Sequence, residues 1–288
     1  MSNRGLVIEE RSRDIGGFLV GRLLPFRKKR MVGPFIFIDH MGPSTISPDN
    51  PFEIGPHPHI GLSTLTYLLE GEIMHRDSVG SVQRITPNEV NWMSAGRGIV
   101  HSERIPEDLK ESTYKLHGYQ IWVAHPEDME DSDPLFAHFA ENELPQWSEN
   151  GLVKRLVAGA AEGRISPVPV LSKLYMIDAR AENDSVWDLS TFEGEKAICV
   201  VSGSVSVDDE VFTNGSLLVA KPGEICSVNV SKETHLLLFG GEPFPEERHI
   251  WWNFVSSKKD KIESAKENWK EGRFPQIPGE SNPIPLPE

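Results

Sequence analysis

The chain of 288 residues has little cysteine and no long apolar run. Its two cysteines, Cys199 and Cys226, are too few for a disulfide framework and lack the spacing of metal ligands. So few cysteines are typical of a protein from a reducing compartment. Both cysteines lie in strand-like apolar runs, which predicts that their thiols are buried and react slowly. No window approaches the ~18 consecutive apolar residues of a membrane span, and no apolar signal core stands near residue 1. We therefore expect a cytoplasmic protein without a membrane partner.

The sequence is also poor in basic charge. Lysine and arginine number 29 against 43 aspartates and glutamates, which gives a net charge of −14 at pH 7. An acidic chain disfavours direct binding to the nucleic-acid backbone. The local run Arg27-Lys28-Lys29-Arg30 is more typical of a solvated turn than of a binding patch. Hydrophobic residues make up 38% and charged residues 25%, as in a soluble globular protein.

The candidate chemistry lies between residues 55 and 103. His57 and His59 are separated by one residue, and so are His101 and Glu103. Side chains alternate between the two faces of a strand, so each pair is predicted to share a face. Strand-like runs and turns separate the pairs, as in a small antiparallel barrel of the jelly-roll and cupin type. Three imidazoles and one carboxylate would then surround one point, which suits a first-row transition metal.

Other polar residues near these pairs leave alternatives open. A lone His-x-His is usually an accident, and only the second pair makes metal binding the better interpretation. His75 could face the interior and orient a metal ligand, or it could face solvent. His40 is more typical of a residue that caps a turn beside a buried strand at 35–38. Gln120 could face the pocket, although a plain core strand is the stronger interpretation.

The run HPHIGLSTLTYLLEG, followed by MSAGRGIVHSE, resembles the pirin family of bicupins. The resemblance extends to GPFIFIDHMGP and GGEPF and covers most of the chain. It implies an all-β bicupin, with two tandem jelly-roll β-barrel domains. It also implies a single iron bound through three histidines and one glutamate, which fall on His57, His59, His101 and Glu103. Some members of this family are quercetin 2,3-dioxygenases, and others are nuclear transcriptional co-regulators.

One position departs from the general cupin pattern. That pattern has a glutamate four residues after the second histidine, where this chain has Ser63. Glu103 restores the carboxylate from the second motif. Serine at position 63 therefore bears on the surroundings of the metal site and on the fit of a substrate. It bears less on whether the site exists.

The length of the chain predicts two domains, at roughly 100–200 residues each. The acidic, proline-containing stretch 125–150 is typical of a linker, and we place the boundary at residue 145. Residues 1–145 would form the metal-binding barrel, and residues 146–288 a second barrel and a C-terminal helix. In that helix, Ile262, Ala265 and Trp269 fall on one stripe.

The second half repeats the first without its chemistry. An ungapped alignment on two shared turns places Leu189 and Thr191 where His57 and His59 stand. The same procedure places Val228 and Val230 at the positions of His101 and Glu103. Leu, Thr and Val cannot reproduce a site of three histidines and a carboxylate. The second barrel is therefore predicted to bind no metal.

The predicted ligand set leaves one or two positions open on a divalent metal, as in reactive sites. Such a site suits Fe(II), which the resemblance favours, although Cu, Ni, Zn or Mn could compete. The resemblance implies cleavage of an aromatic, flavonol-like substrate by dioxygen with loss of carbon monoxide, and Glu103 is the natural general base. The alternative is a metal-dependent, redox-sensing regulatory protein that acts through a protein partner, as a transcriptional or metabolic co-regulator. A third hypothesis is an inert storage or structural bicupin.

Overall fold

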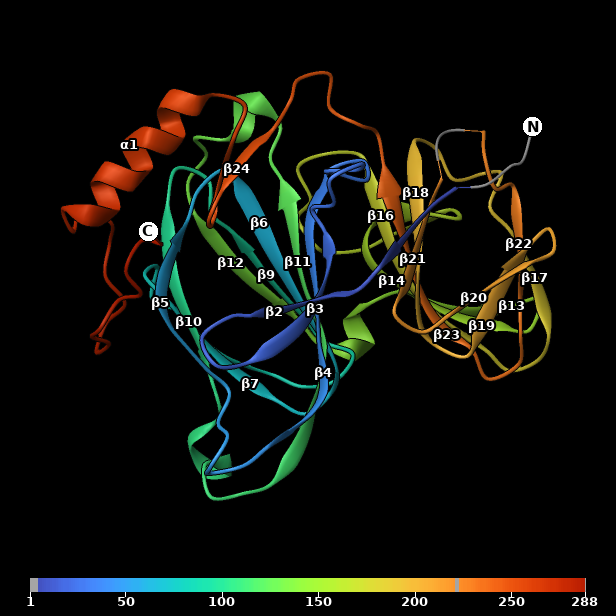
Figure 1. Cartoon of the computed structure of the whole chain (residues 1–288), viewed down its shortest axis with the longest axis horizontal. Coiled ribbons are helices and arrows are strands. Elements are labelled where there is room, and N and C mark those ends of the chain that lie inside the picture. The colour runs from blue at the N-terminus through green and yellow to red at the C-terminus, as the bar shows by residue number, and fades with distance from the viewer. Residues whose placement is uncertain (1–4, 221–222, 288) are drawn as a thin grey trace. The chain divides into compact units, whose positions relative to one another are not determined.

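The computed structural model describes residues 5–220 and 223–287, which are almost entirely antiparallel strands and loops (Figure 1). The described residues form two compact units. One unit contains residues 12–20, 37–141 and 245–287, and we call it the N-terminal barrel. The other contains residues 5–11, 21–36 and 142–244, and we call it the C-terminal barrel. The prediction of an all-β bicupin is confirmed.

The first half of the chain contributes a larger and a smaller sheet. The larger sheet has the order β12 (Leu135–Phe139), β9 (Val90–Ser94), β6 (Leu62–Glu70), β11 (Tyr114–Ala124), β4 (Phe35–Ile46), β3 (Leu19–Leu24) and β2 (Arg11–Asp14). The smaller sheet has the order β5 (Glu53–His59), β10 (Ile99–Arg104), β7 (Ile73–Asp77) and β8 (Val82–Ile85). Short 3-10 turns lie at Glu107–Leu109, Glu127–Met129 and Glu141–Glu143.

The C-terminal barrel repeats this arrangement. Its larger sheet has the order β1 (Leu6–Glu9), β21 (Ser216–Ala220), β18 (Glu195–Ser202), β23 (His235–Gly241), β16 (Leu174–Ala181), β14 (Leu152–Ala161) and β13 (Gln146–Glu149), and β15 (Arg164–Ile165) pairs with β14. Its smaller sheet has the order β17 (Ser185–Asp188), β22 (Ser227–Val230), β19 (Ser204–Val207) and β20 (Glu210–Thr213). Two matching sheet orders are what an internal repeat predicts.

The strands that carry the predicted ligands are buried where those ligands lie. Residues 56–59 of β5 are buried, and so is every residue of β10 except Arg104. The bend before β10 depends on Gly96, whose φ is +49°, because a Cβ there would overlap the carbonyl oxygen of Ser132. Glycine at this position therefore lets the backbone before β10 pass close to Ser132.

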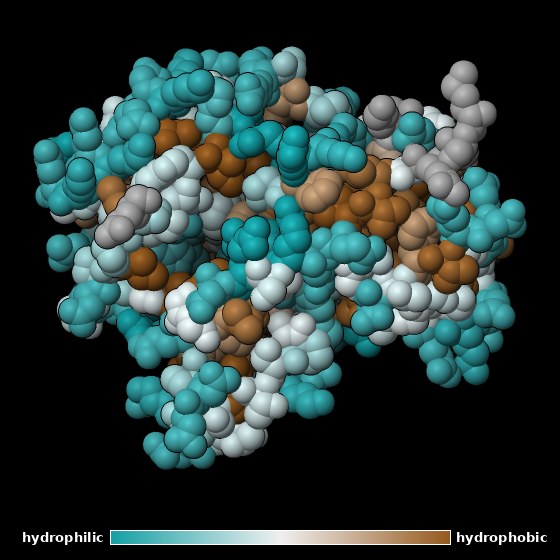
Figure 2. All heavy atoms as spheres, viewed as in Figure 1, coloured by the Kyte–Doolittle hydropathy of each residue, from teal (hydrophilic) through white to brown (hydrophobic). Residues whose placement is uncertain are grey.

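The C-terminal segment contains β24 (His249–Trp251), β25 (Phe254–Ser256) and the helix α1 (Lys259–Lys270). Figure 1 shows the helix α1, and its residues Ile262 and Ala265 are buried in a cluster with Ile60 and Phe254, as the predicted stripe requires. The remaining helix surface is charged, and hydrophilic residues cover this region in Figure 2. The helix is therefore amphipathic and is held by its apolar stripe.

The division of the chain differs from a single cut at residue 145. A break does occur nearby, between residues 141 and 142. The sequence analysis placed residues 245–287 in the second barrel, but they group with the N-terminal barrel. Residues 5–11 and 21–36 group instead with the C-terminal barrel, where β1 pairs with β21. Such exchange of terminal segments depends on long-range pairing, which a local pattern of residues does not encode.

The two cysteines have different environments, so the prediction that both are buried is wrong for one of them. Cys199 is buried in β18, whereas Cys226 is exposed. Cys226 precedes β22 and follows Ile225, whose φ of +48° marks a turn. We expect a thiol reagent to label one thiol per native chain quickly and the second only on unfolding. Replacing Cys226 by serine should abolish the fast phase, and fast labelling that survives the replacement would contradict this assignment.

Candidate metal centre

Three neighbouring strands of the N-terminal barrel bring the ionisable residues together. β10 lies between β5 and β7, and all three run antiparallel to their neighbours. His101 pairs with His57 on one side and with Asp77 on the other, and Glu103 pairs with His75. All five of these side chains are buried. The two motifs thus lie on neighbouring strands, as predicted.

A β-bulge on β5 orients His57. His101 pairs with His57 but Glu103 pairs with Ile54, so β5 has one residue more than β10 over this stretch. The extra residue lets the carbonyl oxygen of Gly55 turn toward the His57 ring, 2.8 Å from Nδ1. Since a carbonyl oxygen only accepts, Nδ1 carries the proton and Nε2 keeps its lone pair for a metal.

The three imidazoles converge on one point. His59 Nε2 and His101 Nε2 are 3.1 Å apart, and one ring nitrogen from each of His57, His59 and His101 lies within 4.8 Å of the others. Two nitrogen ligands at about 2.0–2.1 Å from one ion, at right angles or slightly wider, are about 3 Å apart. The spacing of the imidazoles therefore fits a single transition-metal ion.

Burial keeps these histidines neutral. Burial lowers the pKa of His57 to about 4, against the opposing effect of the Gly55 carbonyl. Burial also lowers the pKa of His59 and of His101 well below the ordinary value, and in both cases the neighbouring His57 adds to the effect. Neutral imidazole is the form that binds metals, so the environment favours the ligand form at neutral pH.

Glu103 lies beside the three-histidine group and belongs to a second, overlapping one. Its carboxylate and ring nitrogens of His75 and His101 lie within 4.8 Å of one another. Burial raises the pKa of Glu103 to about 7, and the Thr66 hydroxyl, 3.4 Å from Oε1, opposes this. The same hydroxyl is 2.8 Å from Gln120 Oε1. The Thr66 hydroxyl therefore lies between the side chains of Gln120 and Glu103.

His75 faces the interior of the barrel, which was one of two alternatives for it. Its Nδ1 is 3.4 Å from His101 Nδ1, and its Nε2 is 3.0 Å from Asp77 Oδ2. Asp77 was not singled out from the sequence, although His75 and Asp77 form another pair at i and i+2 on one strand. Burial alone would raise the pKa of Asp77, but hydrogen bonds from His75 and Ser81 hold it below its ordinary value.

Ser63 lies on β6 and is fully buried. Its hydroxyl is 2.9 Å from His125 Nε2, and the Ser94 hydroxyl is 3.3 Å from the same atom. The residue at the usual cupin glutamate position is therefore used in a buried hydrogen-bond cluster with His125. This accounts for a small hydroxyl side chain at that position.

Comparison with known proteins agrees with the geometry. The family model described as Pirin matches residues 17–123, and the model of the Pirin C-terminal cupin domain matches residues 176–275. The chain belongs to the pirin family. A pirin-like protein of Caulobacter vibrioides is 48% identical over 290 residues, which cover 98% of this chain and 99% of the relative.

Other pirin relatives have names that refer to an activity. A protein of Pseudomonas aeruginosa, provisionally named a quercetin 2,3-dioxygenase, is 38% identical over 259 residues, which cover 89% of this chain and 80% of the relative. The crystal structure of a quercetin 2,3-dioxygenase from Acinetobacter baumannii matches with a TM-score of 0.90 and 35% identity, over 98% of this chain and 95% of that one. The bacterial pirin YhhW of Escherichia coli, solved with nickel(II), matches with a TM-score of 0.64 over 83% of this chain and 99% of that one. At 22% identity, this last likeness concerns the fold.

The pirin C-terminal cupin domain has an apolar interior at the corresponding strands. Trp187, Leu189, Val228 and Val230 are all buried in one hydrophobic cluster. The strand register pairs Val228 with Trp187 and not with Leu189, so the ungapped alignment is two residues out on one strand. Within residues 5–220 and 223–287, the groups of three or more potential ligands lie in the N-terminal barrel.

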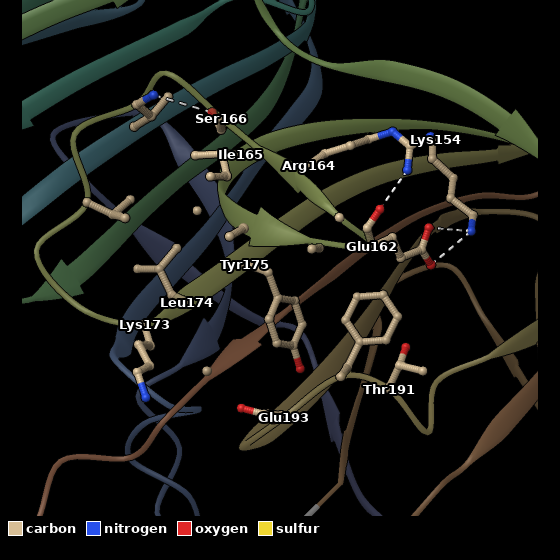
Figure 3. A pocket seen from close by; sticks show the side chains of 18 of the residues that line it. Lys154, Glu162, Arg164, Ile165, Ser166, Lys173, Leu174, Tyr175, Thr191 and Glu193 are labelled. Atoms are coloured by element: carbon tan, nitrogen blue, oxygen red, sulfur yellow. Dashed lines mark hydrogen bonds and ion pairs between the residues drawn. The ribbon is translucent and has the colours of Figure 1, made fainter.

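A wide hollow of about 1240 Å³ lies in the C-terminal barrel (Figure 3). Two of the basic side chains that line it are paired with Glu162. Lys154 Nζ is 2.8 Å from Glu162 Oε2, and Arg164 Nη1 donates to the backbone oxygen of Glu162 at 2.7 Å. This hollow is not lined by a predicted metal ligand, and neither are three others of about 220 to 860 Å³. The histidine cluster itself is buried, because its four candidate ligands are only 1–7% exposed.

Among the described residues, no helix has both the length and the apolar character needed to span a bilayer.

Proposed function

We propose that this pirin-family protein holds one divalent transition metal, iron in the cell, and cleaves a flavonol-type substrate with dioxygen. The observation that carries the proposal is the convergence of His57, His59 and His101, with the buried carboxylate of Glu103 near His101 on the same strand. Bound there, such a metal would supply Lewis acidity and the redox chemistry that dioxygen requires. The similarity to proteins named as quercetin 2,3-dioxygenases supports this class of substrate.

The protein's own residues would hold the metal and move a proton. The three imidazoles would be the nitrogen ligands, with Glu103 as the fourth. Glu103 would also accept the proton of the substrate hydroxyl, since its carboxylate lies within 4.8 Å of a ring nitrogen of His101. Trp122 packs edge-on against His59 at 5.1 Å between ring centroids, and Phe136 stacks on His75. These aromatic rings would exclude water from the site.

A regulatory function is the second candidate, and the enclosure of the site favours it. His59 and His101 are 1% exposed, and His57 and Glu103 are 7% exposed. A substrate of flavonol size needs space beside the metal, whereas a protein that senses the oxidation state of its metal does not. In that case a partner protein would recognise the altered surface.

Metal analysis followed by oxygen uptake would distinguish these functions. We expect one metal per chain, because the corresponding positions of the C-terminal barrel are apolar. Protein reconstituted anaerobically with Fe(II) should then consume dioxygen when quercetin is added, with one carbon monoxide released per substrate. A fully iron-loaded protein that consumes no oxygen with any flavonol would favour the regulatory function. Two metals per chain would contradict the assignment of ligands.

A further inference from the structure

His75 and Asp77 are buried beside the proposed metal ligands, but the proposed reaction assigns them no role. They are 3% and 1% exposed and lie on β7, opposite Glu103 and His101. Asp77 Oδ1 accepts hydrogen bonds from the backbone N–H groups of Val79 and Ser81, at 3.0 Å and 2.9 Å. The turn after β7 thereby fixes the carboxylate, with Oδ2 directed at His75.

The protons of this chain of groups can be assigned one after another. A carboxylate only accepts, so His75 Nε2, 3.0 Å from Asp77 Oδ2, must carry a proton. If this is the only proton on the ring, the lone pair of His75 lies on Nδ1. That atom faces His101 Nδ1 at 3.4 Å, so His101 has to present a proton there, since two lone pairs would repel. The lone pair of His101 is left on Nε2, which faces His59 Nε2 at 3.1 Å in the cluster.

His57 reaches the same state by a simpler route. Its Nδ1 proton is held by the carbonyl oxygen of Gly55, and Nε2 stays free. His101 has a histidine and a carboxylate in the place of that carbonyl. The His75 ring is itself held by Phe136, which stacks on it with 4.5 Å between centroids and 19° between the planes. Both histidines are thus given the tautomer that a metal ligand requires.

We propose that Asp77 and His75 form a positioning pair that fixes His101 in the metal-binding tautomer. The proposal rests on the metal site proposed above and assigns these two residues a function within it. They contact neither substrate nor metal and act only through His101. This function predicts how each substitution changes the tautomer of His101 and the affinity for the metal. A purely structural role would predict neither.

The informative substitution is Asp77→Asn. The two backbone N–H groups keep the amide oxygen at the Oδ1 position, so the amide NH₂ faces His75 Nε2. His75 must then accept at Nε2 and carry its proton on Nδ1. His101 has to accept at Nδ1 and carry its proton on Nε2, where it blocks coordination. An isosteric change two groups away from the metal thus inverts the tautomer of a ligand.

Two readouts test this in the full-length protein. In metal-free protein with ¹⁵N-labelled histidine, NMR should show His101 protonated at Nδ1 in the wild type and at Nε2 in Asp77→Asn. Zinc(II) binding, measured by competition with a chelator, should weaken by about 10–100-fold in Asp77→Asn, the range known for lost orienting partners of ligands. Asp133→Asn, at a carboxylate whose side chain is 82% exposed, is the matched control and should change neither readout.

His75→Phe distinguishes a relay from a packing effect. It removes the acceptor but leaves His101 free to choose either tautomer, so its loss of zinc affinity should be smaller than that of Asp77→Asn. The double variant should bind zinc like His75→Phe alone, because Asp77 acts only through His75. Additive losses, or an unchanged tautomer in Asp77→Asn, would overturn the proposal.

The outcomes also separate this proposal from the metal site. A tautomer switch in Asp77→Asn without zinc binding by the wild type would refute the metal site and leave the relay. Zinc binding by the wild type that Asp77→Asn does not weaken would refute the relay and leave the metal site. If His75→Phe does not fold, the tautomer of Asp77→Asn decides alone.

Discussion

Replacing Glu103 by glutamine should separate metal binding from turnover. We expect flavonol turnover to fall by about 10²–10⁴-fold, the usual contribution of a positioned general base. Glutamine keeps the size and an oxygen donor of the side chain but removes the negative charge and the base. His57, His59 and His101 form a group of potential ligands without Glu103, and three protein ligands suffice in many catalytic sites. Metal binding should therefore weaken by only about 10–100-fold.

The measurement compares oxygen uptake and metal content for Glu103→Gln and two reference variants. Glu107→Gln changes a glutamate on the next turn of the chain whose side chain is 86% exposed, and it should match the wild type in both properties. His101→Ala removes a ligand and should lose metal and turnover together. Full activity in metal-loaded Glu103→Gln would show that another group takes the proton.

That the four candidate ligands lie close together could be predicted from the sequence because each of the two pairs is local. Alternation along a strand puts His57 beside His59 and His101 beside Glu103, and closure of the barrel pairs β5 with β10 although β6 to β9 lie between them in the chain. The same reasoning could not decide whether His75 faces inward. The orientation of His75 depends on which residue of β10 lies opposite it. Other strands lie between β7 and β10 in the chain, so the residues of these two strands alone do not determine their register.

Long-range pairing also explains what sequence reasoning got wrong. An ungapped alignment across two halves accumulates loop-length differences, so Leu189 was matched to a position that the register gives to Trp187 opposite Val228. The apolar run around Cys226 predicted burial, but a turn at Ile225 leaves the thiol exposed. The return of the C-terminal segment to the N-terminal barrel depends on buried contacts made by Arg248, Glu130 and the apolar stripe of α1. A charged pair in such a place cannot be recognised before the fold is known.

This buried pair provides the second prediction of a large effect. The Arg248 and Glu130 side chains are 0% and 1% exposed, and Arg248 Nε lies 3.6 Å from Glu130 Oε1 and donates to the carbonyl oxygen of His125 at 3.1 Å. Glu130 in turn accepts from the Ser256 hydroxyl and from the backbone N–H of Ser257, both at 2.6 Å. The pair thus fastens the segment that carries α1 to the rest of the N-terminal barrel.

Arg248→Met should destabilise this barrel by about 3–5 kcal/mol, because breaking a buried pair leaves an uncompensated charge. The value should lie near the lower end, since Lys261 Nζ remains 3.5 Å from Glu130 Oε2. Urea unfolding followed by tryptophan fluorescence measures the change, because Trp251, Trp252 and Trp269 lie within this segment. Lys110→Met, which breaks an exposed pair with Glu107, should cost less than about 1 kcal/mol.

Adding Glu130→Gln to Arg248→Met should restore part of the lost stability. The second substitution removes the stranded charge, while the amide oxygen can still accept from Ser256 or Ser257. The double variant should therefore unfold at a higher urea concentration than Arg248→Met alone, although each single substitution is destabilising. If the losses of unfolding free energy from the two single substitutions simply add, the unpaired charge of Glu130 is not the cause of the destabilisation by Arg248→Met. The apolar contacts of the C-terminal segment would then hold it to the N-terminal barrel.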